Sequence, residues 1–203
     1  MSLYERHVLP HLVNCVCGTG SMRRRRQKVL PEAHGRVLEV GFGTGHNLPY
    51  YEHHRVDHLW ALEPSRASWA LARSRVAAAS FPVEYLPSGA EEIPLPAAAA
   101  DTVVVTFALC TIGDVALALA EIRRVLRPGG ELVFCEHGAA PDADVRRWQD
   151  RIDPFWCRVA GGCHLNRPIA ALIQRAGFRI ERLESGYGSG PRIASYHSWG
   201  AAT

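Results

Sequence analysis

A short apolar strand that runs directly into a glycine-rich loop is the feature that most restricts what this chain can fold into. Residues 37–47 read VLEVGFGTGHN, and the loop places glycine at 41, 43 and 45. Glycine has no Cβ, so such a loop lets a ligand lie against bare backbone. A second predicted strand, 58–62, ends in Glu63, roughly one β-α-β unit after the loop. A carboxylate there can accept hydrogen bonds from both hydroxyls of a ribose. Together these features predict a nucleoside-containing cofactor.

The spacing of the glycines discriminates between cofactors. A dinucleotide loop requires G-x-G-x-x-G, with a helix N-terminus directed at a pyrophosphate. This chain has G-x-G-x-G, and His46 occupies the place of the third dinucleotide glycine. Glu39, two residues before the first glycine, would place negative charge beside the pocket, which suits a cationic ligand better than a pyrophosphate. A nicotinamide-dependent oxidoreductase is therefore disfavoured, and a tight turn without a ligand is the structural alternative.

The remaining pattern alternates between helices and strands. Helical sequence is predicted at 1–34, 65–79, after Asp114 until Pro128, from 141, and at 167–176. Strands are predicted at 83–86, 101–106, 132–135, 178–184 and 192–199. Such alternation predicts an α/β fold, with a mostly parallel sheet and helices on both faces. The last two strands, joined by a glycine-rich turn at 186–190, are predicted to form an antiparallel hairpin at the edge.

Composition limits the function classes. The 203 residues, 47% of them hydrophobic, fit a single domain, 1–203. A net charge of +3 is too mild to indicate nucleic acid, no apolar stretch is long enough to span a membrane, and residues 1–12 do not form a signal peptide. The six cysteines lack the spacing of a secreted disulfide framework, which predicts a cytoplasmic protein. Cys157, Cys163 and His164 lack paired ligand spacing, so no metal is expected.

Several motifs resemble one family. Residues 39–45, Glu-x-Gly-x-Gly-x-Gly, resemble the first motif of class I S-adenosylmethionine (SAM) methyltransferases, and 88–94 and 126–130 resemble further segments of its type 11 branch. Residues 148–167, with 109–111 and 136–138, resemble the methyltransferase-like 7 group and its bacterial relatives. The resemblance covers almost the whole chain. It implies a Rossmann-like fold with a seven-stranded, mostly parallel sheet whose last strand is antiparallel, and SAM as the cofactor.

The resemblance also implies a substrate class. Some animal members of the group methylate thiols, so a small-molecule thiol is the first candidate acceptor, and an amino-lipid or a quinone is the alternative. Those members carry an N-terminal membrane-targeting segment that we do not expect here. A non-catalytic SAM-binding protein is the alternative from another class. The oligomeric state is left open.

The expected cofactor contacts combine the glycine loop, the second strand end and the family motifs. They are Glu39, Gly41, Gly43, Gly45, Asn47, Glu63, Pro64, Ala90, Glu91, Thr106, Phe107 and Cys110. Gly89 stands where many family members have an aspartate that accepts the adenine amino group. Adenine recognition is therefore expected to use the backbone near Ala90, the Glu91 side chain, or packing against Ile93.

The acceptor site is expected beyond the methyl group. His137 is the first choice for a general base, because it follows the fifth strand at its carboxyl end and an unperturbed histidine has a pKa near about 6.5. Residues 1–34 are expected to form a helical lid. Tyr4, His11, His164 and Arg167 are weaker candidates for lid or acceptor contacts. The basic run at 23–26 is interpreted as a solvated helix face, with contact to an anionic partner as the alternative.

Overall fold

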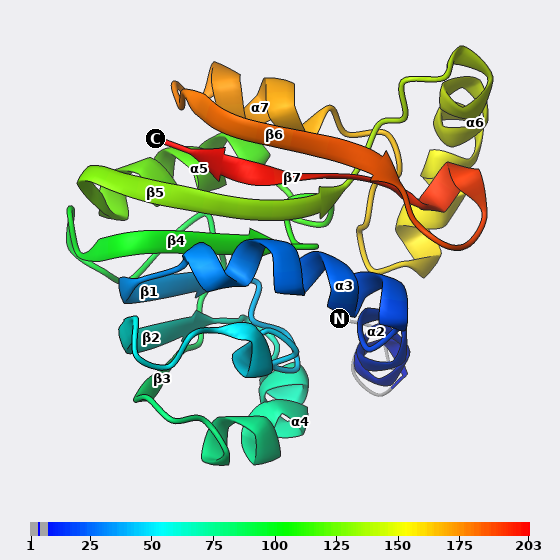
Figure 1. Ribbon diagram of the computed structural model, residues 1–203. Coiled ribbons are helices and arrows are strands. Elements are labelled where there is room, and N and C mark those ends of the chain that lie inside the picture. The colour runs from blue at the N-terminus through cyan, green and yellow to red at the C-terminus, as the bar shows by residue number, and fades with distance from the viewer. Residues whose placement is uncertain (1–3, 5–7) are drawn as a thin grey trace.

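One mixed sheet organises the molecule, for which the computed structural model describes residue 4 and residues 8–203 (Figure 1). The strand order across the sheet is β3-β2-β1-β4-β5-β7-β6. Neighbouring strands from β3 to β5 run parallel, and β7 is antiparallel to both β5 and β6. The strands are β1 (Gly35–Val40), β2 (Val56–Leu62), β3 (Val83–Leu86), β4 (Ala100–Thr106), β5 (Leu126–His137), β6 (Ile180–Tyr187) and β7 (Tyr196–Ala202). The predicted seven-stranded sheet with an antiparallel last strand is confirmed.

The strand order reverses direction next to β1. The chain passes from β1 outward through β2 to β3, then returns to place β4 on the other side of β1. In open α/β sheets, ligands bind outside the carboxyl ends of the strands at such a reversal. The topology therefore directs attention to the loops after β1 and β4.

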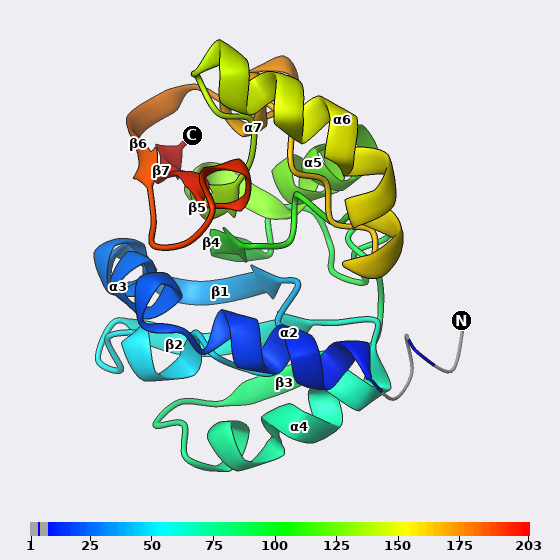
Figure 2. The ribbon, with the colours of Figure 1, turned by 90° about the vertical axis from the view of Figure 1, so that its right-hand side faces the viewer.

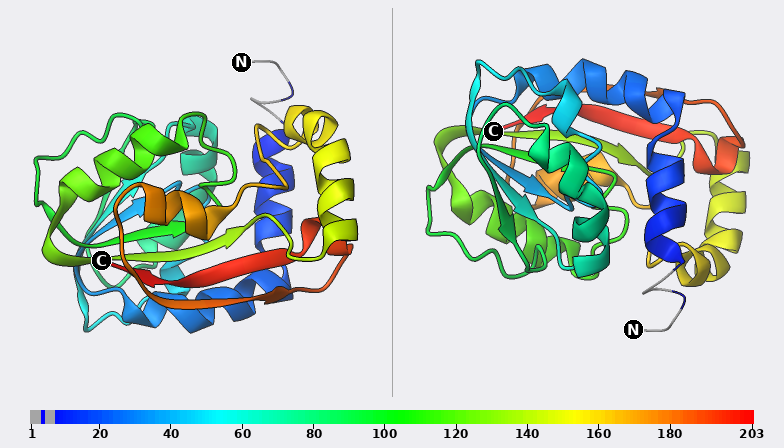
Figure 3. Two further views of the ribbon diagram at one scale, coloured as in Figure 1. Left: turned by 90° about the horizontal axis from the view of Figure 1, so that it is seen from above. Right: turned by 90° about the horizontal axis from the view of Figure 1, so that it is seen from below.

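Helices cover both faces of the sheet and also one of its ends. They are α2 (Leu9–Cys17), α3 (Gly20–Val29), α4 (Arg66–Ala77), α5 (Val115–Val125), α6 (Ala143–Val159) and α7 (Ile169–Arg175), with the 3-10 turns η1 (Leu30–Glu32), η2 (Leu48–Tyr50) and η3 (Arg192–Ala194). α3 and α4 contribute to one core cluster, while α5 and α7 contribute to the other. α2 and α6 lie beyond the carboxyl ends of the central strands (Figures 2 and 3).

Local signals begin two of the helices at the predicted residues. The Ser65 hydroxyl accepts a hydrogen bond from the Ser68 amide at 3.2 Å, which caps α4. The Asp114 carboxylate accepts one from the Leu117 amide at 3.0 Å, which caps α5. In each case a short polar side chain satisfies an amide that the first helical turn leaves without a partner.

Three predicted boundaries are wrong. α5 ends at Val125 rather than at Pro128, and β5 starts at Leu126 rather than at residue 132. A proline disfavours helical backbone at the residue before it, so Arg127 cannot continue the helix, and Leu126 pairs with Ala100 of β4 instead. The last strand begins at Tyr196, because residues 192–194 form the turn η3.

The basic run at 23–26 is only half solvated, which corrects the expected solvated face. Arg23 and Arg24 are exposed, whereas Arg25 and Arg26 retain 8% and 3% of their accessible surface. The Arg25 guanidinium lies 4.2 Å from the centre of the Trp199 ring and donates to the Gly186 carbonyl at 3.0 Å. α3 packs along the sheet, so the helical period turns two of the four arginines inward.

Candidate functional site

An open cleft lies at the carboxyl ends of the first four strands. Its volume is about 680 Å³, within the range of sites that hold small molecules. Its walls come from the loops after β1 to β4, from α2 and from the residues after α6. The lining residues are Leu9, Pro10, Val13, Val40, Gly41, Gly43, Leu62, Glu63, Pro64, Ser65, Ser68, Ser88, Gly89, Ala90, Glu91, Phe107, Ala108, Thr111, Ile112, Gly113, Ala160 and Gly161.

The glycine loop requires glycine for two different reasons. Gly41 has φ +70°, and a Cβ at this position would lie 2.4 Å from the Ala108 Cβ. Gly43 has φ +58°, but a Cβ there would meet nothing closer than 3.8 Å. Gly41 therefore permits close packing of the β1 and β4 loops, whereas Gly43 keeps the cleft surface bare for a ligand.

Glu63 connects the glycine loop to the start of α4. One carboxylate oxygen accepts from the Gly43 amide at 2.8 Å, and the other accepts from the Ser65 amide at 2.7 Å. Burial raises the pKa of this carboxyl from its ordinary value, although both backbone hydrogen bonds lower it. Each carboxylate oxygen can accept more than one hydrogen bond, so Glu63 is held in place at the cleft wall and retains acceptor capacity for a ligand.

Three of the predicted cofactor residues form a buried network instead of lining the cleft. The Asn47 amide donates to Glu39 Oε1 and to Thr106 Oγ1, each at 2.9 Å. The Tyr51 hydroxyl donates to Glu39 Oε2 at 2.6 Å, and Arg26 Nε donates to Asn47 Oδ1 at 2.7 Å. Burial raises the pKa of Glu39 to about 8. In this structure the network supports the glycine loop from inside the protein.

The opposite wall of the cleft contains the predicted adenine segment. Gly89, Ala90 and Glu91 line the cleft, and the Asp114 amide donates to Glu91 Oε1 at 3.3 Å. Ile93 is buried behind this segment rather than at the cleft surface. Phe107 also lines the cleft, with φ +55°. A bulky residue in the left-handed region is a strained arrangement of the kind found at functional sites.

The structure therefore separates the predicted cofactor residues into two groups. Those at the cleft surface are Gly41, Gly43, Glu63, Pro64, Ala90, Glu91 and Phe107. Those behind it are Glu39, Gly45, Asn47, Thr106 and Cys110. The residues at the surface came from loops that directly follow a strand, where sequence position alone predicts exposure to the cleft.

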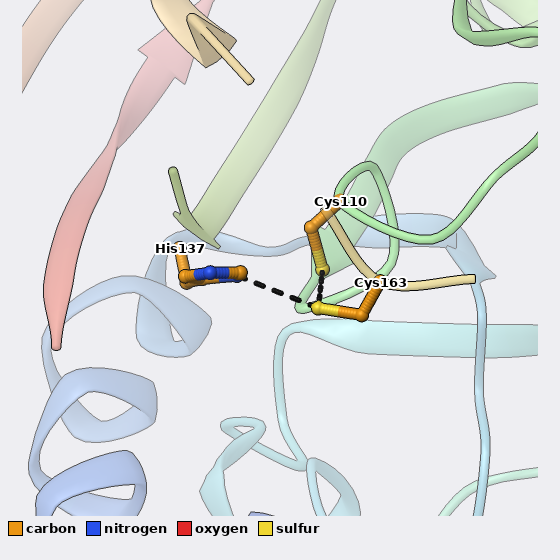
Figure 4. Close-up of side chains that lie close together, drawn as sticks. All are labelled: Cys110, His137 and Cys163. Atoms are coloured by element: carbon orange, nitrogen blue, oxygen red, sulfur yellow. Dashed lines mark hydrogen bonds between the residues drawn. The ribbon is translucent and has the colours of Figure 1, made fainter. Parts of the chain in front are cut away.

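His137 lies at the end of β5 beside two cysteines from distant segments (Figure 4). His137 Nδ1 is 3.8 Å from Cys163 Sγ, which is 3.6 Å from Cys110 Sγ. Burial favours the neutral ring, but hydrogen bonding to Cys163 and the neighbouring charges raise the pKa of His137 above its ordinary value. Hydrogen bonding to Cys110, followed by contact with His137, lowers the pKa of Cys163.

Glu136, next to His137, is a residue that the sequence did not single out. Its carboxylate is fully buried and accepts from the amides of Ala108, Leu109 and Cys110 at 2.7, 3.0 and 3.4 Å. Burial raises its pKa to about 7. The carboxylate fixes the loop after β4, and with it the position of Cys110. The sequence signal that could have identified Glu136 as a functional residue is its place directly after the apolar run at 132–135.

The weaker acceptor candidates have varied surroundings. The Tyr4 hydroxyl donates to the Val159 carbonyl at 2.8 Å, and His11 is exposed on α2. His164 Nδ1 lies 2.8 Å from Asp153 Oδ2, and Arg167 donates to the carbonyls of Leu109 and Ile112. None of these four side chains lines the cleft. Tyr4 and His164 contact α6, and Arg167 joins the segment after α6 to the loop after β4.

The residues that sequence reasoning missed at the cleft are small or apolar. Leu9, Pro10 and Val13 of α2 lie on one side, and Ala160 and Gly161 follow α6. α2 and the end of α6 lie side by side there, where a Cβ on Gly161 would be 2.4 Å from Leu9 (Figure 3). Within residues 8–203, no helix combines the length and the apolar character needed to cross a membrane.

Comparison with known proteins gives related sequences and folds. A methyltransferase domain family model matches residues 38–134. The chain is 32% identical over 153 residues to thiol S-methyltransferase TMT1B of Rattus norvegicus, covering 73% of this chain and 62% of that protein. It is 38% identical over 121 residues to a phosphatidylethanolamine N-methyltransferase of Cereibacter sphaeroides, covering 59% of each. It is 32% identical to a demethylmenaquinone methyltransferase of Thermus thermophilus, covering 71% of this chain and 70% of that protein.

The chain thus spans less than two thirds of the length of the rat relative. A crystal structure of an S-adenosylmethionine dependent methyltransferase from Mesorhizobium loti has the same fold, with a TM-score of 0.67 and 21% identity over 92% of this chain and 99% of that one. The glycine loop and Glu63 lie within the matched family model. By sequence and by fold, the chain belongs to the class I S-adenosylmethionine-dependent methyltransferase family.

Proposed function

We propose that this chain binds S-adenosylmethionine in the cleft and catalyses methyl transfer to a small-molecule acceptor. The observation that carries the proposal is the Glu63 carboxylate, held by the Gly43 and Ser65 amides at the wall of a cleft that a bare glycine loop borders. These residues fit the cofactor, because Glu63 keeps acceptor capacity for two ribose hydroxyls and Gly43 leaves the adjoining surface free of side chain.

The proposed roles follow from the position of each residue. When bound, S-adenosylmethionine supplies an activated methyl group on a sulfonium sulfur. Glu63 would hold the ribose, and Ala90, Glu91 and Phe107 would enclose the base. The buried group of Glu39, Asn47 and Thr106 would keep the glycine loop in place. Holding two reactants in near-attack geometry can supply roughly 7–11 kcal/mol in favourable cases, so positioning is the main task of these residues.

A thiol is the proposed acceptor class. The rat and human relatives are named thiol S-methyltransferases. Leu9, Pro10, Val13 and Ala160 give one end of the cleft an apolar lining, which suits an acceptor with an apolar body. An amino-lipid or a quinone is the second candidate class. It is supported by the relatives named phosphatidylethanolamine N-methyltransferase and demethylmenaquinone methyltransferase.

His137 is the proposed proton acceptor, and α2 is the proposed lid. His137 lies at the carboxyl end of β5, one strand beyond the glycine loop and β4. α2 contributes Leu9, Pro10 and Val13 to the cleft, and a cover at that place would exclude water during transfer. α3 is excluded from the lid, because its inner face packs against the sheet.

A cytoplasmic location remains our proposal, supported by six cysteines that are all free.

The decisive experiment combines binding with a substrate panel. Calorimetry with SAM and with NAD tests the cofactor, and we expect binding of SAM alone. Labelled SAM is then incubated with thiols, phenols, amines, quinones and amino-lipids, and methylated product and S-adenosylhomocysteine are measured. Turnover that is greatest with thiols supports the proposal. Tight SAM binding without turnover on any acceptor would favour a non-catalytic SAM-binding protein, and binding of NAD alone would overturn the cofactor assignment.

A further inference from the structure

Three potential metal ligands meet beside the cleft from three separate segments. Cys110 follows β4, His137 ends β5, and Cys163 follows α6. One ligand atom from each residue lies within 4.8 Å of the other two. Cys110 and His137 are buried, while Cys163 is partly exposed (Figure 4). Cys110 is adjacent in sequence to Thr111, which lines the cleft, and the cleft residue Gly161 is two positions before Cys163.

The measured separations match those of a tetrahedral site. Zinc bonds of about 2.3 Å to sulfur and about 2.0–2.1 Å to nitrogen, at tetrahedral angles, place two thiolates about 3.8 Å apart and a thiolate and an imidazole nitrogen about 3.6 Å apart. The two sulfur atoms here are 3.6 Å apart, and His137 Nδ1 is 3.8 Å from Cys163 Sγ. Both distances lie within about 0.2 Å of these values, so the Cys110–Cys163 and His137–Cys163 pairs can each span one tetrahedral ion.

Hydrogen bonds to the backbone hold the loop that carries Cys110 against the segment that carries Cys163. The buried Glu136 carboxylate accepts a hydrogen bond from the Cys110 amide, and the Cys110 carbonyl accepts one from the His164 amide at 2.7 Å. Arg167 Nη1 donates to the Leu109 and Ile112 carbonyls on either side of Cys110. The loop after β4 and the segment after α6 are thereby joined by their backbones, so the two sulfur atoms are brought together by the fold itself.

We propose that Cys110, His137 and Cys163 form a three-ligand site for a thiophilic divalent cation, Zn²⁺ in the first instance, whose fourth position takes an acceptor thiol. Two thiolates and an imidazole suit zinc, and three protein ligands with one open position are the pattern of catalytic zinc sites. The metal site itself does not depend on the proposed function, whereas the role of its fourth ligand rests on the proposed thiol methyltransferase activity.

The proposed chemistry is a ligand exchange with a defined proton balance. Binding of the cation releases one proton from each cysteine, and His137 binds as the neutral imidazole. An acceptor thiol then loses its proton to solvent as its sulfur bonds to the metal, because a coordinated thiol is deprotonated. The lone pair of that sulfur would form the new bond to the methyl carbon as the bond from that carbon to the sulfonium sulfur breaks; the electron pair of the broken bond stays on the sulfonium sulfur, and the products are the methyl thioether and S-adenosylhomocysteine. A His137 nitrogen that binds the metal does not accept the proton of the acceptor thiol. Measuring the metal content of the active protein therefore distinguishes His137 as a metal ligand from His137 as a proton acceptor.

Metal binding is tested first, without any methyl-transfer assay. Reduced, chelator-treated protein is titrated with Zn²⁺ and with Co²⁺, and bound metal is measured by elemental analysis and by the thiolate-to-cobalt absorption band. We expect one equivalent per chain. Cys163→Ser and His137→Gln should each weaken binding by at least 10-fold. The matched control is Cys157→Ser, because Cys157 contacts His164 at 3.6 Å and lies outside the cluster.

A second measurement covers variants that fail to fold. Wild-type protein is alkylated with iodoacetamide with and without Zn²⁺, and each cysteine is followed by mass spectrometry. Zinc should protect the partly exposed Cys163, whereas exposed Cys15 should react equally in both samples and buried Cys110 should stay unmodified in both. Absence of stoichiometric metal uptake by reduced wild-type protein would overturn the site, as would equal loss of binding in Cys157→Ser.

The fourth-ligand role has its own test. Addition of 2-mercaptoethanol, a small neutral thiol, to the cobalt-loaded protein should intensify the thiolate-to-cobalt band, because a third sulfur joins the metal. An unchanged band would overturn the acceptor role. Calorimetry with SAM on the metal-free protein tests the cofactor assignment separately, so failure of the metal site and failure of the proposed function give different results.

Discussion

The two halves of the cleft are built by different means. The half formed by the loops after β1 and β2 uses backbone: the Gly43 and Ser65 amides hold Glu63, and the bare surface of Gly43 borders the cleft. The half nearest α2 and the end of α6 uses side chains, with an apolar lining and the Cys110–His137–Cys163 cluster behind it. The first half is formed within one continuous stretch of the chain, from β1 to the start of α4, whereas the second needs segments from both ends of the chain.

This difference separates cofactor binding, which stays constant, from acceptor recognition, which can vary. A cofactor-binding loop made of backbone tolerates few substitutions, because its shape depends on glycine at positions with positive φ. A half made of side chains on a helix and a loop can change its chemistry while the sheet stays the same. We therefore expect substitutions in the first half to affect SAM binding and folding, and changes in the second half to affect the acceptor.

The largest expected effect comes from Gly41→Ala in the backbone half. The new Cβ would lie 2.4 Å from the Ala108 Cβ at a residue with φ +70°. Left-handed backbone and overpacking together should cost about 2–5 kcal/mol of unfolding free energy. Gly129→Ala is the matched control, because Gly129 has φ +75° and no atom within 4 Å of its added Cβ, so only the backbone cost of about 1–2 kcal/mol applies. Urea unfolding that ranks the two variants equally would contradict the packing role of Gly41.

The second prediction concerns the pH dependence of the buried network under the glycine loop. Burial raises the pKa of Glu39 to about 8, so the folded protein binds a proton that the unfolded chain has released above its ordinary pKa. Stability from this group is complete at low pH and is lost as pH rises through the folded pKa. Glu39→Gln should remove on the order of 2–4 kcal/mol of the fall in unfolding free energy between pH 5 and 8.

Urea titrations of the SAM-free protein at several pH values measure this slope. Glu136, whose pKa burial raises to about 7, should account for part of the fall that remains. A Glu39→Gln variant with the same slope as the wild type would show that Glu39 does not carry the proton.

Glu63→Ala should have the next largest effect, and it acts on the cofactor. Loss of a charge-assisted contact to the ribose should cost about 1.5–3 kcal/mol, which corresponds to roughly 10- to 150-fold weaker SAM binding. Calorimetry measures the change. Glu92→Ala is the control, because Glu92 is exposed and does not line the cleft. Unchanged SAM affinity in Glu63→Ala would remove the ribose assignment.

The smallest expected effect on SAM affinity comes from removing α2. A variant lacking residues 1–20 should fold, because α3 and the sheet retain their packing, and its SAM affinity should fall by less than roughly threefold, about 0.6 kcal/mol. Its kcat with the best thiol should be lost, because the lid no longer excludes water. Thermal unfolding checks the fold, and product formation checks turnover. Full activity in the folded truncation would show that α2 is no lid.

Features that were predictable from the sequence are those that meet a local requirement of the backbone. The capping residues Ser65 and Asp114 each satisfy an amide three residues further along the chain, and Glu63 accepts from the Ser65 amide two residues on. The glycines of the loop supply the positive φ that the backbone needs at their own positions. Such needs restrict residue type at one position, so the alternation of elements and the position of Glu63 can be read from the chain. The helix and strand boundaries near Pro128 were missed, because pairing of Leu126 with β4 decides them.

The sequence by itself determined the α/β order, the bare glycine loop and the acidic residue after β2. Only the tertiary structure decided that Arg25 and Arg26 face inward, that Glu39 and Asn47 support the loop from behind, and that Cys163 meets residues 53 and 26 positions earlier. The physical reason is range: backbone conformation depends on neighbouring residues, whereas side-chain clusters depend on which strands and helices the completed sheet brings together.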